Sequence, residues 1–367
     1  MAGVQSVFKW LVKYVLAWLL APFYMLSATF VFILSVIRSP VATLSYRVRD
    51  SPPAVLQNAE LGTHEYVRVG TSNIRLHYVA SGDRDKPLMV CLHGFPEFWY
   101  SWRHQLKAFS KDYWVVAVDM RGFGDSDKPP AAGEYKIDKM AGDIVDLIEA
   151  LGHRSCTLVG NDGGAIMAAW VAMERPDLVK KLVLMNGPVS LSAVRQYTKS
   201  HPKQLLKFWY GFFFKLSYLP EMCLGFNDLK SLDVLLRGKK MGCRREDAIT
   251  DEDLEAYKYA LSQPGALTAV VNFYRASGSK DRTFLLTLVK NWLSGQQPPA
   301  EPITAISCPS LLIWGDQDGV LDTDLARAMA ESVQGMKLEI IEGASHFVQQ
   351  DFPDTVNRLM TDFFKEL

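Results

Sequence analysis

The sequence predicts an α/β fold in which a mostly parallel sheet carries helices on both faces. The first observation is that short, continuously apolar runs alternate with helical patterns, as they do in sheets covered on both sides. The second is a long helical stretch rich in aromatic residues, which interrupts this alternation and indicates an inserted helical cap. The third is an uncharged apolar segment near the N-terminus, which predicts a transmembrane helix. We therefore divide the chain into a membrane anchor (1–38), a linker (39–63), a first core part (64–188), a helical cap (189–300) and a second core part (301–367).

The composition is that of a large globular domain with an insertion. The chain has 367 residues, of which 49% are hydrophobic and 22% charged, and its formal net charge is zero. It has no basic run with interleaved aromatic residues, so we expect no nucleic-acid partner. The five cysteines show neither a CxxC pair nor a Cys/His ligand spacing, so we infer neither a disulfide framework nor a metal site.

The N-terminal apolar segment covers residues 14–37, between Lys13 and Arg38, and contains no charged residue. A spanning helix needs about 20 apolar residues to cross roughly 30 Å of hydrocarbon, and this segment is long enough. The alternative is a cleaved signal peptide, whose apolar region is shorter, at about 7–15 residues. We therefore expect a single-pass membrane protein anchored through residues 14–37. Basic residues on both sides leave its orientation open.

The predicted strands follow the apolar runs in order along the chain. Before the cap they are Tyr66–Val69 and Ile74–Val79, which read as a pair, followed by Leu88–Leu92, Trp114–Val118, Cys156–Val159 and Leu182–Met185. After the cap they are Ser310–Trp314 and Leu338–Ile341. Helical patterns such as 143–151 separate the central strands, and this order predicts parallel pairing.

The strongest chemical signal is the sequence VGNDGGA at residues 159–165, where a buried strand runs into a turn and then a helical pattern. Such a turn is typical of a nucleophile elbow, which needs small neighbours because its backbone is strained and crowded. Asp162 stands at the position of the nucleophile, and no G-x-S-x-G accompanies it, so a serine hydrolase is not favoured. The alternative is that Asp162 caps the helix that begins at Gly163.

Two further polar residues follow predicted strands in the order that an elbow nucleophile requires, first an acid and then a base. Asp318 follows the strand SLLIW, and His346 follows the strand LEII. Ligands bind at the carboxyl ends of parallel strands, where both residues are expected. Asp318 alone reads as a turn residue and His346 alone as a structural histidine. Together with Asp162 they predict a catalytic triad.

Two loops after predicted strands complete this end of the sheet. The sequence HGFPE begins at His93 and provides a glycine-containing turn that can direct backbone N–H groups at a developing oxyanion. We assign the N–H groups of Phe95 and Gly163 to this oxyanion hole. The stretch DMRGFGDS at 119–126 follows another strand, and we interpret it mainly as a loop-ordering element.

Several stretches together resemble a known family. They are HGFPEFWYSWR (93–103), DMRGFGDSD (119–127), the elbow with Asp162, GDQDGVLD (315–322) and GASHF (343–347). They resemble the α/β-hydrolase fold epoxide hydrolases, and the N-terminal segment and length resemble the membrane-bound branch of epoxide hydrolases 3 and 4. The resemblance extends from about residue 60 to the C-terminus. It implies the α/β-hydrolase fold and conversion of epoxides to vicinal diols.

The resemblance also implies two cap tyrosines that hold the epoxide oxygen. Tyr210 in HPKQLLKFWYGFFF and Tyr274 in the sequence NFYR match them, although ordinary aromatic packing is the alternative for both. The chain departs from the family at the elbow, which is usually Gly-His-Asp-Trp-Gly-Gly. Here Asn161 replaces the His and Gly163 replaces the Trp. The N–H of Gly163 is retained, but loss of the Trp wall predicts a looser pocket and a more flexible turn.

These residue types suit the opening of an epoxide. A carboxylate of pKa about 3.9 is already charged at neutral pH, so Asp162 can attack without a base. Tyrosine hydroxyls can protonate the departing alkoxide, and His346, oriented by Asp318, can activate the water that cleaves the ester. No metal or organic cofactor is required. We expect lipophilic epoxides as substrates, in particular epoxy fatty acids, and a location in the endoplasmic reticulum or microsomal membrane.

Two other interpretations stay open. A haloalkane dehalogenase shares the Asp nucleophile, but it needs donors for a halide, typically a Trp after the nucleophile, where this chain has Gly163. A catalytically retired, membrane-tethered binding protein would account for the altered elbow. Retired sites usually lose a member of the triad, however, and none is missing here.

Overall fold

The computed structural model of the protein describes residues 23, 26–27, 29–71, 73–276 and 306–366. Its centre is an eight-stranded sheet with the order β1-β2-β4-β3-β5-β6-β7-β8. The strands are β1 (Thr63–Val69), β2 (Ile74–Ser81), β3 (Leu88–Leu92), β4 (Trp114–Asp119), β5 (Cys156–Asn161), β6 (Val179–Met185), β7 (Ser310–Gly315) and β8 (Met336–Ile341). β1 and β2 pair antiparallel, as do β2 and β4, and the remaining pairs are parallel. The predicted mostly parallel sheet is therefore confirmed.

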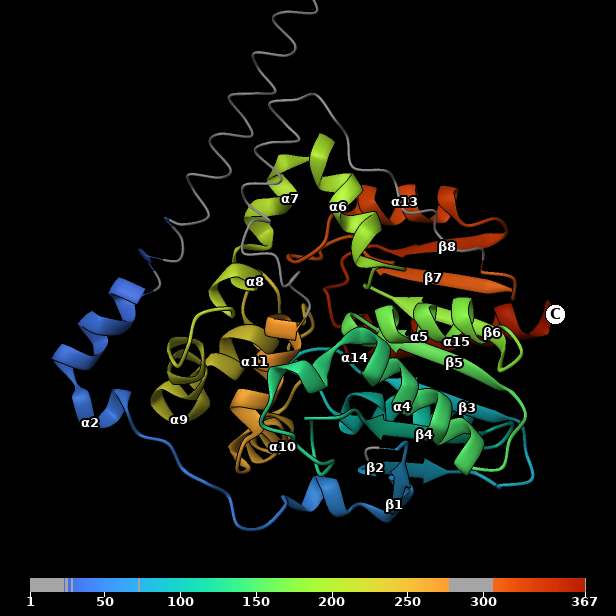
Figure 1. Ribbon diagram of the computed structural model, residues 1–367, viewed down its shortest axis with the longest axis horizontal. Helices are drawn as coiled ribbons and strands as arrows, with labels where there is room; N and C mark the ends of the chain where they lie inside the picture. Colours follow the sequence, from blue (N-terminus) through green and yellow to red (C-terminus); the bar gives the residue numbers. More distant parts are fainter. Residues whose placement is uncertain (1–22, 24–25, 28, 72, 277–305, 367) are drawn as a thin grey trace, which may run out of the picture.

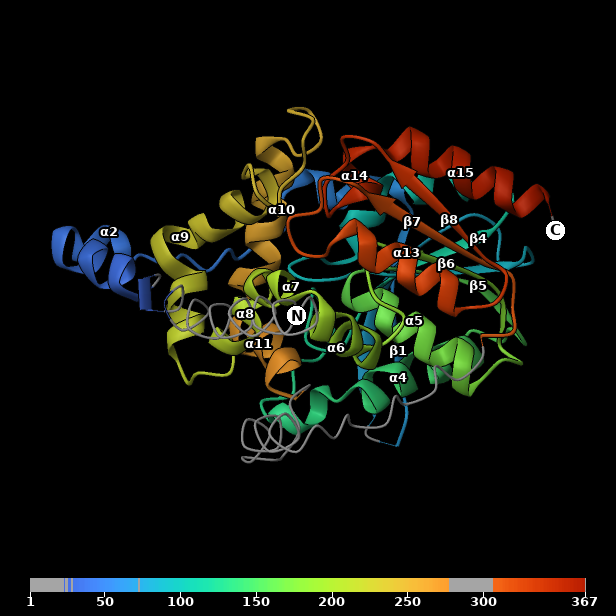
Figure 2. The ribbon, with the colours of Figure 1, turned by 90° about the horizontal axis from the view of Figure 1, so that it is seen from above.

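Helices cover both faces of this sheet. They are α3 (Arg103–Phe109), α4 (Ile137–Ala150), α5 (Gly163–Glu174), α13 (Thr323–Ser332), α14 (Val348–Asp351) and α15 (Pro353–Lys365). Figure 2 shows α15 on one side of the strands and α4 and α5 on the other. Every residue of β3, β4 and β5 is buried, which explains why these strands read as continuous apolar runs.

A group of helices lies between β6 and β7 in the chain. It consists of α6 (Leu191–Ser200), α7 (Pro202–Lys207), α8 (Trp209–Phe213), α9 (Leu219–Arg237), α10 (Asp251–Ser262) and α11 (Ala266–Ala276). Figure 1 shows α8 to α11 gathered at one end of the sheet. α9 is interrupted by a kink at Phe226–Leu229, where Asn227, Asp228 and Leu229 have positive φ angles. The predicted cap is helical where it is described, but its boundary near residue 300 lies outside the described residues.

Most of the predicted anchor also lies outside the described residues, which include a helical stretch at 29–38 and α2 (Pro40–Thr43). Among the helices that the structure describes, none has the length and apolar character that a membrane crossing requires. The stretch predicted as a linker is bound to the cap. The Arg49 guanidinium contacts Asp228 in the α9 kink and Glu255 on α10, at 3.0 Å in each case. The Tyr46 hydroxyl donates to the Leu261 carbonyl.

Candidate active site

Asp162 occupies a strained turn between β5 and α5. Its φ and ψ are 47° and −115°, a left-handed combination that is costly for a residue with a side chain. The close approach of neighbouring backbone explains two of the small residues. A Cβ on Gly160 would lie 2.4 Å from the Gly164 carbonyl oxygen, and one on Gly164 would lie 2.1 Å from the Leu92 carbonyl oxygen. The Asp162 side chain makes no capping hydrogen bond to α5, so the structure does not favour the helix-cap alternative.

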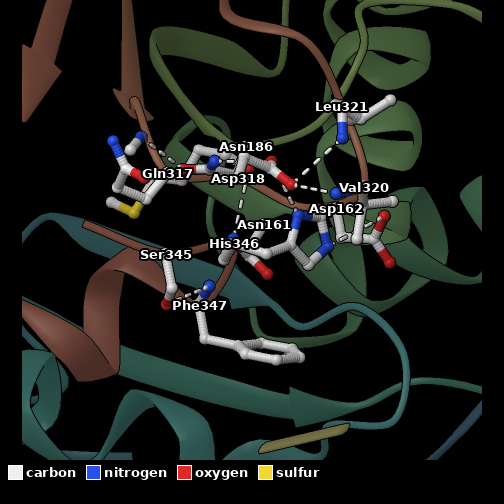
Figure 3. A network of polar contacts seen from close by, with 12 residues as sticks. Asn161, Asp162, Asn186, Gln317, Asp318, Val320, Leu321, Ser345, His346 and Phe347 are labelled. Carbon is white, nitrogen blue, oxygen red and sulfur yellow. Dashed lines mark hydrogen bonds and ion pairs between the residues drawn. The ribbon is translucent and has the colours of Figure 1, made fainter. Parts of the chain in front are cut away.

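The structure brings together the three residues of the predicted triad. His346 follows β8 and is only 2% exposed. Its Nδ1 lies 2.9 Å from Asp318 Oδ2, and its Nε2 lies 3.6 Å from Asp162 Oδ1. Figure 3 shows the imidazole between the two carboxylates. This is the arrangement of a base that one carboxylate orients toward the other.

Asp318 is held by neighbouring donors that the sequence did not reveal. Its Oδ1 accepts the N–H groups of Val320 at 2.6 Å and Leu321 at 3.0 Å. Its Oδ2 accepts the Asn186 side-chain amide at 2.7 Å, and Asn186 in turn accepts the Gly315 N–H at 3.0 Å. Asn186 directly follows β6, and this position at the carboxyl end of a parallel strand was the available signal. These bonds fix the carboxylate that orients His346 (Figure 3).

Opposite charges stabilise each other across the triad. Burial favours the neutral imidazole of His346, but the carboxylates of Asp318 and Asp162 outweigh it and hold the pKa of His346 well above its ordinary value. Burial likewise raises the pKa of Asp162, but His346 and the N–H groups of Phe95 and Gly163 outweigh it and lower that pKa. Each of these two groups therefore favours the charged form of the other.

The predicted oxyanion donors already contact Asp162. The Phe95 N–H donates to Asp162 Oδ2 at 3.1 Å, and the backbone N–H of Gly163 helps to lower the pKa of this carboxylate. In contrast, Oδ1 is the oxygen that faces His346. The two oxygens of Asp162 thus differ in their surroundings.

The Phe95 loop rests on Glu97, a buried residue whose role sequence reasoning missed. Glu97 accepts the Gly94 N–H at 3.2 Å and the side-chain amides of Gln349 and Gln350 at 2.8 and 2.7 Å. Burial raises the pKa of Glu97 to about 7. A Glu in a Gly/Pro-containing loop normally reads as solvent-exposed, and nothing local in HGFPE indicated otherwise.

Asp119 orders the neighbouring loops, as the sequence predicted for the stretch that it begins. Its Oδ1 accepts the Trp99 N–H at 2.8 Å, and its Oδ2 accepts the Asp125 N–H at 2.9 Å. The same carboxylate pairs with His77 Nδ1 at 2.7 Å. Asp119 is fully buried with its oxygens satisfied, so it serves the scaffold of the site.

The two predicted cap tyrosines lie beside each other. Tyr210 on α8 and Tyr274 on α11 have ring centroids 5.8 Å apart, and Tyr274 also packs against Phe95 at 5.6 Å. Burial, with the negative charges of Asp162 and Asp318, raises the pKa of Tyr210 well above its ordinary value. Burial, with Tyr210 and Asp162, does the same for Tyr274. Both phenols therefore stay protonated and can donate a hydrogen bond close to the Asp162 charge.

The space beside Gly163, where the sequence predicted a missing wall, is occupied. A Cβ on Gly163 would lie 3.3 Å from Cζ of Phe273 on α11. An aromatic ring from the cap therefore covers the elbow at this point.

Within the described part of the chain, no cluster of three or more His, Cys, Asp or Glu side chains is arranged to hold a metal ion.

Comparison with known proteins places this site in a family. Residues 87–353 match the family model described as alpha/beta hydrolase fold. The chain is 39% identical to Epoxide hydrolase 4 of Homo sapiens over 368 residues, which cover 100% of this chain and 95% of that protein. It is 39% identical to Epoxide hydrolase 3 of Xenopus tropicalis, with coverages of 99% and 93%.

A solved structure agrees with these sequence relatives. It is a variant of an epoxide hydrolase from Bacillus megaterium in complex with its product, a naphthyloxy-propane-1,2-diol. It superimposes with a TM-score of 0.69 at 30% identity and covers 82% of this chain and 100% of that chain. The chain therefore belongs to the α/β-hydrolase fold family, among the epoxide hydrolases.

Proposed function

We propose that this protein hydrolyses epoxides to vicinal diols through a covalent ester on Asp162. The observation that carries the proposal is the elbow Asp162, which has a lowered pKa and accepts the Phe95 N–H with one oxygen, beside two tyrosines with raised pKa values. A carboxylate nucleophile suits an sp³ carbon because it needs no deprotonation before attack. The diol product of the solved relative supports the same reaction.

In the first step Asp162 Oδ1 attacks an epoxide carbon while Oδ2 stays bound to the Phe95 N–H. A new C–O bond forms to the enzyme, and the epoxide C–O bond breaks. The leaving oxygen takes a proton from the hydroxyl of Tyr210 or Tyr274 and becomes an alcohol. The products of this step are a hydroxyalkyl ester on Asp162 and one tyrosinate.

Formation of the ester changes the basicity of His346. The charge on Asp162 is one of the two that hold the His346 pKa up, and it disappears when the carboxylate becomes an ester. His346 can then release its extra proton, which restores the tyrosinate to tyrosine. The histidine thus becomes a neutral base at the stage when water must be activated.

In the second step neutral His346 takes a proton from water, and the hydroxide adds to the Asp162 ester carbonyl. The negative charge develops on Oδ2, to which the Phe95 N–H already donates, and we assign the Gly163 N–H as the second donor. One such donor contributes roughly 2.7–4 kcal/mol to stabilising the transition state. As the intermediate collapses, the bond to the former Oδ1 breaks, and the leaving oxygen takes a proton from protonated His346, which recovers one from the added hydroxyl group. The diol leaves with the former Oδ1, and the Asp162 carboxylate returns with one oxygen from water.

A single turnover in oxygen-18 water tests this route. With enzyme in excess, we expect label in the Asp162 carboxylate and none from water in the diol, as measured by mass spectrometry of the peptide and the product. Enzyme kept in labelled water without epoxide is the control and should stay unlabelled. Label in the diol after one turnover would mean direct attack by water and would contradict the proposal.

The ester is also expected to accumulate at low pH. Asp162 stays charged there because its pKa lies below its ordinary value, so alkylation continues. At about pH 5, below the ordinary histidine pKa of about 6.5, His346 in the ester form is protonated and cannot act as a base. At alkaline pH it is neutral, and the ester is consumed. Intact-mass measurement on acid-quenched enzyme during turnover checks this, and an ester fraction independent of pH would contradict it.

The expected substrates are lipophilic epoxides, in particular epoxy fatty acids. Of the fifteen large apolar side chains exposed in the described residues, ten lie at 23–48 and four at 216–234. These two segments pack together through Phe32 and Phe226, whose ring centroids are 6.2 Å apart. Exposed apolar patches mark protein or membrane interaction sites. The patch formed by 23–48 and 216–234 includes the described part of the apolar segment at 14–37. This supports a membrane partner and, with the resemblance, a location in the endoplasmic reticulum.

A substrate panel tests the expected class. Membranes that contain the full chain should form diols faster from epoxy fatty acids than from small aromatic epoxides such as styrene oxide. Membranes with the inactive variant Asp162→Ala provide the background. Equal rates, or faster turnover of styrene oxide, would contradict the fatty-acid assignment and leave the epoxide reaction itself intact.

A further inference from the structure

Gly163 differs from Gly160, Gly164 and Gly187 in what limits its size. A Cβ on Gly160, Gly164 or Gly187 would meet backbone atoms at 2.1–2.5 Å, which no side-chain movement can relieve. Among the described residues, a Cβ on Gly163 would come within 4 Å of Phe273 alone, with Cζ at 3.3 Å and Cε1 at 3.6 Å. Position 163 is therefore kept small by one side chain of the cap.

The backbone at position 163 does not require glycine. Gly163 is the first residue of α5, and its φ is not in the left-handed region that favours glycine. This backbone conformation allows a side chain at position 163. Packing against Phe273 is therefore the remaining reason for a glycine there. Gly163 and Phe273 thus form a complementary pair across the boundary between core and cap.

Phe273 is held firmly in this position by its neighbours on α11. Asn272 is buried and donates to the Pro130 carbonyl of the core at 3.1 Å. Arg275 pairs with Glu221 on α9 at 2.7 Å. The Phe273 ring also packs at 84° to the ring of Tyr274, with centroids 5.3 Å apart. The ring is therefore placed next to both an oxyanion donor and a proton donor.

We infer that Phe273 is the specificity-determining wall of the pocket, which fills the space left by Gly163 and limits the substituent next to the reacting carbon. This inference rests on the proposed epoxide hydrolysis. A substituent on the attacked carbon must lie close to Asp162 and therefore near the Gly163 N–H, which the Phe273 ring covers. The wall favours epoxides attacked at an unhindered carbon and disfavours those with large groups on both carbons.

A double-mutant cycle with Phe273→Ala, Gly163→Phe and the double variant tests this pair. The probes are a terminal epoxide, 1,2-epoxyoctane, and a disubstituted one, trans-stilbene oxide, each scored by kcat/KM. Phe273→Ala should raise the ratio of stilbene oxide to epoxyoctane at least tenfold. Gly163→Phe alone should reduce activity on both probes at least tenfold and lower the melting temperature. The double variant should recover most of both losses, because the new ring occupies the vacated space.

Leu267→Ala provides a matched control on the same helix. Leu267 packs against Gly225 of α9, away from the elbow, so this truncation should lower the melting temperature without changing the substrate ratio. Phe273→Leu is a milder second variant and should shift the ratio in the same direction as Phe273→Ala.

The outcomes separate this inference from the proposed function. Wild-type protein without epoxide hydrolysis would overturn the proposed function, while the melting temperatures of the cycle would still measure whether the two positions are coupled. An active wild type with an unchanged substrate ratio in Phe273→Ala would overturn the inference alone. Additive melting temperatures in the cycle would show that the two side chains do not compete for one space, and this would overturn it as well.

Discussion

Asp162→Ala is expected to abolish diol formation, with kcat reduced by at least about 10⁴-fold, a loss of the size seen when a covalent nucleophile is removed. The variant lacks the oxygen that forms the ester, and neither Tyr210 nor Tyr274 can replace it because their raised pKa values keep them protonated. Diol formation from an epoxy fatty acid, followed by mass spectrometry, measures the loss. The intact mass of this variant should show no adduct after exposure to substrate.

Asp316→Ala is the matched control for this loss. Asp316 also follows β7, but its carboxylate accepts the Gly343 N–H at 2.8 Å and does not contact His346. It should retain most of the activity. If Asp162→Ala kept more than about a hundredth of the wild-type rate, Asp162 would not be the nucleophile. If the wild type were also inactive toward epoxides and halides, the retired binding protein would become the better interpretation.

His346→Ala is expected to stop the reaction after its first half. Asp162 keeps the oxygens that form the ester and the backbone N–H groups of Phe95 and Gly163, which help to lower its pKa, so we expect it still to open the epoxide. Without His346 no base activates water, and the ester persists. One equivalent of substrate mass should appear on the protein, with a burst of epoxide consumption and a fall in kcat of at least about 10³-fold.

The combination of the two variants makes this expectation specific. The adduct of His346→Ala should map to the peptide that contains Asp162 and should be absent in the double variant with Asp162→Ala. Loss of diol without any adduct in His346→Ala would instead place the histidine in the first step, as a proton donor or a structural support. Halide release from haloalkanes, measured on the same samples, would separate the dehalogenase alternative from epoxide opening.

Sequence reasoning identified the strands because their physics is local. A continuous apolar run such as Leu88–Leu92 reports burial on both faces without reference to the rest of the chain. The ends of the strands were harder to predict from the sequence, since β4 and β5 end in the polar residues Asp119 and Asn161. The α9 kink was not predictable, because the positive φ angles at 227–229 accompany contacts of Asp228 with Arg47 and Arg49, which are remote in sequence.

The triad residues were predictable because each follows a strand in a required order, and parallel strands bring their carboxyl ends together. Asn186 was missed although it follows a predicted strand, because an amide there also reads as a turn residue. Glu97 was not predictable, because a loop carboxylate reads as exposed. The pairing of Gly163 with Phe273 joins residues distant in the sequence. The prediction of a looser pocket was based on position 163 alone, whereas Phe273 of the cap fills the space beside it.

The contacts of Arg49 have a consequence for how the protein can be shortened. Arg49 bridges the α9 kink and α10, and its carbonyl accepts the side-chain amide of Gln263 at 3.0 Å. A chain trimmed to its catalytic part beyond residue 50 would keep every triad residue and both tyrosines. It would nevertheless lose the Arg49 contacts that link α9 and α10, so the helical cap of the trimmed enzyme would be less rigid than that of the full chain.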